Sequence, residues 1–105
     1  MLQKFKITGD SQTIATSTSA SQTALSAANL ASEWLLVQND AVSASANIIR
    51  FRLGGASADA DGKGMILHGG LAGVMVKRGA NDTHIGWDAA AATPNLLVTP
   101  VIPMD

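Results

Sequence analysis

The chain has 105 residues and a formal net charge of −1, and charged residues make up only 14% of it. This length favours a single domain, expected to span residues 1–105, and the lack of a basic excess argues against nucleic acid as a main ligand. The sequence contains no cysteine, which excludes disulfides and thiolate metal sites.

The low charge also bears on the surface, because an ordinary soluble domain has about 25% charged residues. We therefore infer that copies of the chain or other proteins cover part of its surface, with an uncharged Ser/Thr-rich surface as the alternative. No apolar run approaches the ~20 residues of a membrane span. The first residues also lack the apolar core of a signal peptide, so we expect no membrane partner.

The first residues alternate in character, with Phe5 and Ile7 on one face and Lys4 and Lys6 on the other. This period of two predicts a half-buried strand. Gly9, Asp10 and Ser11 then give a turn signal.

The segment 11–32 is rich in Ser, Thr and Ala and carries no charge. It could be an arm that is disordered by composition, or two thin strands over 12–17 and 22–26 that bury Ile14 and Leu25. A helix over 23–34 is a further alternative. We favour the strands, because disordered segments are usually rich in charge.

The remaining strands are expected over 34–38, 48–53, 64–68, 71–77, 83–87 and 96–101, with turns where Gly, Asn, Asp or Pro cluster. In residues 48–53, Ile49, Phe51 and Leu53 alternate with the outward Arg50 and Arg52. The strand at 34–38 is apolar on both faces, which predicts a central or covered strand. Pro100 and Pro103 favour an edge or exit position, and the last four residues are expected to leave the domain.

Six to nine short antiparallel strands at this spacing predict an all-β fold, a β-sandwich or a jelly-roll-like arrangement. No set of residues is placed to do chemistry. There is no G-x-S-x-G nucleophile elbow, and the glycine turns lack the Lys and Ser/Thr of a phosphate loop. We therefore expect no enzyme and no cofactor.

Three residue pairs are candidate ligand sites. Asp59 and Asp61 have the spacing of calcium ligands but lack the rest of a calcium loop, and His68 and His84 lack the short spacing that supports a zinc site. Neither pair predicts a metal site. Trp34 and Trp87 could form an aromatic platform for a sugar, although core positions are the commoner use of tryptophan.

Protein contacts are the better use of the surface residues. Trp34, Leu36, Leu96 and Val98 are candidate outward apolar contacts, and Arg50 and Arg52 share one sheet face beside Ile48. Arginine is enriched at subunit interfaces. A plain solvent face is the alternative for the arginine pair.

Between Ser32 and Val101 the order of motifs resembles that of small β-sandwich virion proteins of tailed bacteriophages. The motifs are LLVQND, IIRFRLGG, a polar loop ADADGKG, MILHGGL, GVMVKRG, Thr83-His84-Ile85 and finally Leu97-Val98-Thr99. The resemblance implies a structural role in the virion, either decorating or cementing the head or contributing to the neck or tail.

This resemblance sets the expected partners and location. We expect a homo-oligomer, with a trimer favoured, that binds major capsid or other virion proteins and is assembled in the host cytoplasm. A carbohydrate-binding β-sandwich, for example on a head fibre or tail, is the alternative function.

Overall fold

The computed structural model describes residues 4–41, 47–57, 64–70, 73–90 and 94–104. The elements within these ranges are β1 (Phe5–Ile7), β2 (Gln12–Ala15), β3 (Ser21–Ala24), α1 (Ala27–Leu30), β4 (Trp34–Asn39), β5 (Ile48–Gly54), β6 (Met65–His68), β7 (Val74–Lys77), β8 (His84–Ala89) and β9 (Asn95–Pro103).

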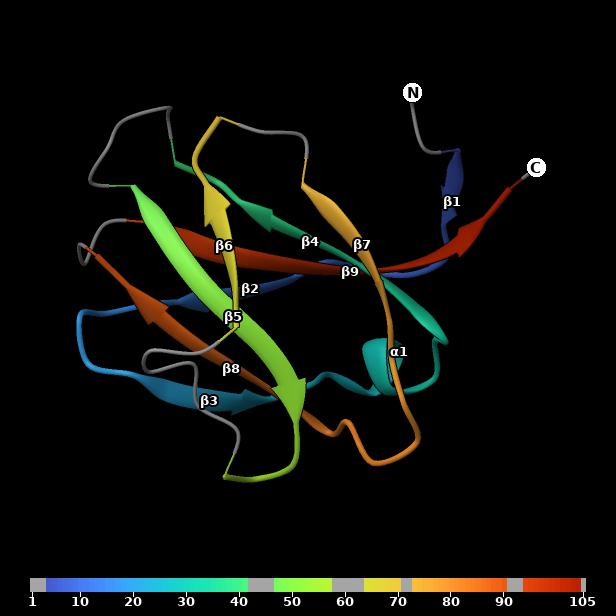
Figure 1. Cartoon of the computed structure of the whole chain (residues 1–105). Helices are drawn as coiled ribbons and strands as arrows, with labels where there is room; N and C mark the ends of the chain where they lie inside the picture. The colour runs from blue at the N-terminus through green and yellow to red at the C-terminus, as the bar shows by residue number, and fades with distance from the viewer. Residues whose placement is uncertain (1–3, 42–46, 58–63, 71–72, 91–93, 105) are drawn as a thin grey trace.

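The strands form two antiparallel sheets that face one another (Figure 1). Sheet A has the order β2-β9-β4-β7, with β1 continuing the β2 side along the end of β9. Sheet B has the order β3-β8-β5-β6. The chain crosses between the sheets after β2, β3, β4, β6, β7 and β8, which is the connectivity of a jelly roll of two Greek keys. The expected all-β sandwich is confirmed.

The core lies between the two sheets and is made of alternate residues on the central strands. Leu35 and Val37 of β4 and Leu96 and Val98 of β9 are all 0% exposed. From sheet B they meet a second set of buried side chains: Ile49, Phe51, Leu67, Ile85, Trp87 and Ala89. The alternation expected in residues 48–53 is therefore the alternation observed, with Arg50 and Arg52 facing away from the core.

The segment 11–32 forms β2, β3 and the one-turn helix α1, and the two residues expected to be buried, Ile14 and Leu25, are each 4% exposed. A buried amide network holds the helix in place. The side chain of Asn29 donates to Gln12 Oε1 and to the backbone oxygen of Val98, both at 3.2 Å. Gln12 in turn accepts from the backbone N–H of Ser26 at 2.8 Å. Small residues are ordered here because this polar network ties them to β2 and β9.

Arg78, which follows β7, ties the α1–β4 connection to the turn before β8. Its guanidinium donates to the backbone oxygens of Leu30 at 2.5 Å and Ser32 at 3.1 Å. It also donates to the oxygens of Gly79 and Asp82 in its own turn. The bond to Leu30 caps a carbonyl at the end of α1, where a cation is favoured.

The expectation that Pro100 sits at an edge is wrong, because it lies inside β9 between β1 and β4, with its side chain fully buried. Its carbonyl accepts from the N–H of Thr8 at 3.0 Å, so its ring nitrogen also faces the break between β1 and β2. Gly9 lies at this break, and a Cβ there would come within 3.0 Å of the proline ring. A missing N–H is tolerated where the neighbouring ladder is already interrupted.

The end of the chain also differs from the expectation. Ile102 and Pro103 do not leave the domain but pair with Lys6 and Phe5 of β1. The pairing of β4 with β9 ends at Val101, so β1 and the end of β9 continue as a two-stranded ribbon at one corner of the sandwich (Figure 1). We call residues 4–8 and 101–104 the corner ribbon.

Candidate interaction surfaces

The outer face of sheet A is apolar over β4 and its neighbours. Trp34 and Leu36 point away from the core, because Leu35 and Val37, which alternate with them, point into it. Trp34 lies between Lys77 and Val101, and Leu36 between Met75 and Thr99. Leu36 is only 7% exposed, whereas Trp34 is half-buried. Of these two interface candidates, Trp34 therefore offers more surface to a partner.

Two other interface candidates are not on the surface. Leu96 and Val98 are 0% exposed and belong to the core cluster. The residues of β9 on the outer face are Leu97, Thr99 and Val101. Leu97 is half-buried, and Thr99 and Val101 are 2% and 1% exposed. Both alternate sets on β9 are apolar, so a period of two could not tell which set faces the core.

Arg50 and Arg52 lie on the outer face of sheet B, on the opposite side of the sandwich from Trp34 and Leu36. Arg50 is directly across from Asp88 of β8, and Arg52 is across from Gly86. A hollow of about 230 Å³ lies beside Arg50, with Ile48 and Ile66 among its lining residues. The apolar and the arginine candidates therefore belong to two separate surfaces.

A larger groove, of about 690 Å³, opens beside the corner ribbon. Its walls come from α1, from the start of β4 and from the ends of β1 and β9, and its lining residues are Thr8, Ala28, Ala31, Ser32, Glu33, Trp34, Val101, Ile102 and Pro103. Most of these side chains are small or apolar. Such a lining suits apolar side chains better than a charged ligand.

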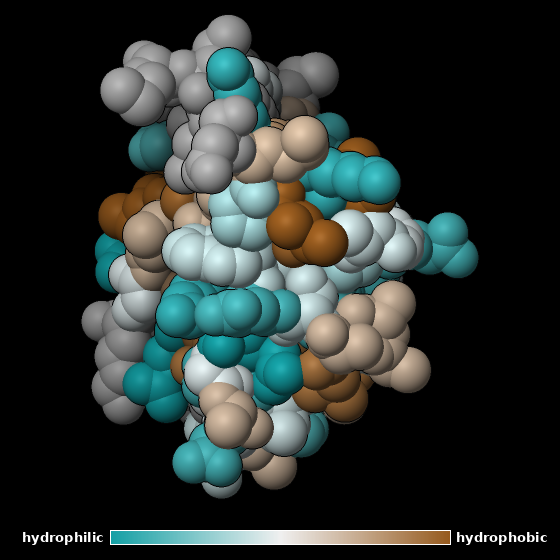
Figure 2. Space-filling model, turned by 90° about the vertical axis from the view of Figure 1, so that its right-hand side faces the viewer, coloured by the Kyte–Doolittle hydropathy of each residue, from teal (hydrophilic) through white to brown (hydrophobic). Residues whose placement is uncertain are grey.

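The corner ribbon itself exposes large apolar side chains. Ile7 is 58% exposed, Ile102 53% and Met104 56%. Lys6 is opposite Ile102 and Ile7 is opposite Val101, so Ile102 and Ile7 lie on different faces of the ribbon. Viewed from the side where β1 and the end of β9 lie, hydrophobic side chains stand at the surface among polar ones (Figure 2). The sequence predicted Ile7 to be half-buried with Phe5, and its exposure is a correction.

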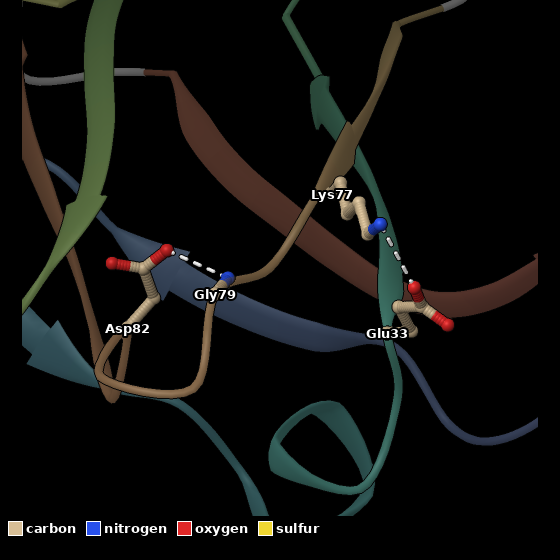
Figure 3. A network of polar contacts seen from close by, with 4 residues as sticks. All are labelled: Glu33, Lys77, Gly79 and Asp82. Carbon is tan, nitrogen blue, oxygen red and sulfur yellow. Dashed lines mark hydrogen bonds and ion pairs between the residues drawn. The ribbon is translucent and has the colours of Figure 1, made fainter.

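Charged groups lie at the edge of the groove. Glu33 pairs with Lys77 at 3.1 Å across β4 and β7, and both side chains are more than 60% exposed (Figure 3). In the turn that follows β7, the carboxylate of Asp82 accepts from the backbone N–H of Gly79 at 2.8 Å (Figure 3). The Glu33–Lys77 pair is therefore a surface pair that contributes little to stability.

The two tryptophans do not form one platform. Trp87 is 8% exposed on the inner face of sheet B, and its indole N–H donates to Thr23 Oγ1 at 3.0 Å. Trp34 is in sheet A and lines the groove. The structure thus places one tryptophan in the core and leaves one partly accessible.

The histidines are also separated. His68 is opposite Ile48 and His84 is opposite Gly54, at the two ends of β5, which puts them about 20 Å apart. Nδ1 of His84 lies 2.9 Å from the hydroxyl of Thr83. Asp59 and Asp61 lie outside the described residues. Within the described ranges, no group of three His, Cys, Asp or Glu residues is arranged to hold a metal ion.

Comparisons with models of protein families, with curated proteins and with solved structures found no match. Among the described residues, no helix is long and apolar enough to cross a membrane.

Proposed function

We propose that this chain is a non-enzymatic structural protein of a tailed-phage virion that decorates or stabilises the capsid through protein–protein contacts. The observation that carries the proposal is the apolar surface at one end of sheet A, formed by Trp34 and the exposed Ile7, Ile102 and Met104. Large apolar side chains exposed close together at one corner are typical of protein interaction sites. The jelly roll, a fold also used by viral capsid domains, and the order of motifs described above support the virion context.

A decorating protein needs one surface for the capsid, and the sandwich offers two candidates on opposite faces. Trp34 represents the apolar face of sheet A, and Arg50 and Arg52 represent the outer face of sheet B. Binding energy at protein interfaces is concentrated in a few Trp, Tyr and Arg anchors. We assign the capsid contact to Trp34 and its neighbours, because Arg50 already faces Asp88 across the strands.

The test is sedimentation of the purified chain with capsids from a phage that lacks the gene. We expect saturable pelleting with the capsids, and a loss of at least tenfold in affinity for Trp34→Ala, the loss that corresponds to about 1.4 kcal/mol. The matched control is the double variant Arg50→Ala/Arg52→Ala on the opposite face, which should pellet like the unmodified chain. If the unmodified chain stays in the supernatant at saturating capsid, the proposal is wrong.

The carbohydrate-binding alternative has one observation in its favour, since Trp34 lines the groove beside hydroxyl and carboxylate groups of Ser32 and Glu33. An indole face with a few polar groups is a surface on which a sugar ring can stack. Quenching of Trp34 fluorescence by glycans, in the variant Trp87→Phe, would favour this function over the capsid contact.

A further inference from the structure

We propose that the groove beside the corner ribbon receives the corner ribbon of a second copy of this chain. This inference goes beyond the proposed function and does not depend on the capsid; it gives a geometry to the homo-oligomer that the sequence leads us to expect. It arises because the same corner of the molecule carries both an apolar projection and an apolar recess.

The ribbon itself provides the apolar projection. Among the described residues, β9 has no strand partner on the side of β4 beyond Val101, so this edge of the two-stranded ribbon is open. Ile102 and Ile7 lie on different faces, and each is more than half exposed. A two-stranded ribbon is marginally stable in water without packing on a face. Covering these side chains therefore favours an associated state over the free chain.

The free edge of β9 at the groove decides whether the contact is made by backbone or by side chains. The N–H of Met104 and the carbonyl of Pro100 both face β1. Because backbone groups alternate sides along a strand, the backbone polar groups of residues 101 and 103 face the opposite edge, towards the groove. The carbonyl of Val101 already accepts from the hydroxyl of Ser32 at 3.2 Å. Pro103 has no N–H to donate. This edge is poorly suited to pairing with an incoming strand, so the contact is made by side chains.

The charges at this corner indicate that the occupant of the groove is a second copy of the chain. Lys6 lies opposite Ile102 in the ribbon, and Lys4 lies two residues further along, opposite Met104. Glu33 lines the groove, and its side chain is 64% exposed even though it pairs with Lys77. A lysine of one ribbon can therefore meet Glu33 of the other copy. Because the same chain supplies both charges, a second copy fits the groove without any other partner.

The place of Ile102 bears on the symmetry of the contact. Ile102 belongs both to the exposed ribbon and to the groove wall, so the ribbon and the groove lie at the same corner of the molecule. Each copy can then place its ribbon in the groove of a neighbouring copy and bind a neighbour's ribbon in its own groove, as in a closed symmetric assembly. A pair or a ring of copies meets this condition. Trp34 lines the groove and also lies on the outer face of sheet A, so the contact between copies adjoins the proposed capsid contact.

Cross-linking tests this geometry directly, because the natural chain has no cysteine. Two single-cysteine variants, Met104→Cys on the ribbon and Ala31→Cys in the groove, are mixed and oxidised. We expect disulfide-linked pairs containing one copy of each variant. The matched control replaces Met104→Cys with Ile66→Cys, an exposed apolar position on β6 that is 46% exposed.

The proposal is overturned if no mixed pairs form, or if Ile66→Cys gives as many mixed pairs with Ala31→Cys as Met104→Cys does. A second measurement uses the mass in solution. Ile102→Glu should reduce the assembly to monomers, whereas Ile66→Glu should leave the mass unchanged. A chain that cross-links as expected but does not sediment with capsids would contradict the proposed virion role and leave this inference standing.

Discussion

At the scale of single residues, the most informative position is Asn29 in α1. Its side chain is 0% exposed and donates two hydrogen bonds, while its own oxygen has no partner among the described residues. Both neighbouring groups, Gln12 Oε1 and the carbonyl of Val98, are acceptors, which fixes the orientation of the amide. One residue thus joins α1 to β2 and β9.

We predict that Asn29→Ala lowers the free energy of unfolding by about 1–3 kcal/mol, because the buried acceptors lose a donor. Urea denaturation followed by circular dichroism measures this change. The matched control is Asn81→Ala, at an exposed turn position, which should change stability by less than about 0.5 kcal/mol. Equal effects of the two substitutions would mean that the network does not stabilise the segment 11–32.

At the scale of elements, the approach of β7 to β4 depends on Gly73. Its φ is +101°, and a Cβ there would lie 2.7 Å from the carbonyl oxygen of Val37 and 2.6 Å from the side chain of Gln38. We predict that Gly73→Ala destabilises the fold by at least about 1–3 kcal/mol, since backbone strain and the collision with a carbonyl act together.

Gly55 gives the comparison for this prediction, because a Cβ there meets nothing within 4 Å and its φ is not positive. Gly55→Ala should be neutral or slightly stabilising, through the smaller entropy of the unfolded chain. Thermal unfolding of the two variants separates these effects. A Gly73→Ala variant as stable as Gly55→Ala would contradict the described path into β7.

The strands also show how much of the fold the sequence could predict. Alternation located β5 and β8 and the inward side chains Ile49 and Ile85, because one face of each strand is apolar and the other is not. On β9 both faces are apolar, and the pattern gave no basis for choosing between Leu96 and Leu97. The prediction for Pro100 was wrong for a different reason. Its missing N–H faces a break in the ladder, and only the register of β1 and β2 reveals this break.

At the scale of the whole molecule, the groove could not be predicted from the sequence. Its walls bring together residues 8, 28, 31–34 and 101–103, and several of them are Ala, Ser and Thr, which carry no distinctive pattern. The low charge did predict that part of the surface is covered by protein, but it did not locate that part. The structure shows three large apolar side chains, Ile7, Ile102 and Met104, exposed at one corner, and this corner is the surface that we propose is covered.

The central claim is that protein subunits cover this apolar corner, and the mass of the purified chain in solution tests it most directly. Light scattering over a dilution series should give a whole multiple of 10.7 kDa at high micromolar concentration, falling towards the monomer on dilution. A constant monomer mass up to the highest concentration would contradict the claim.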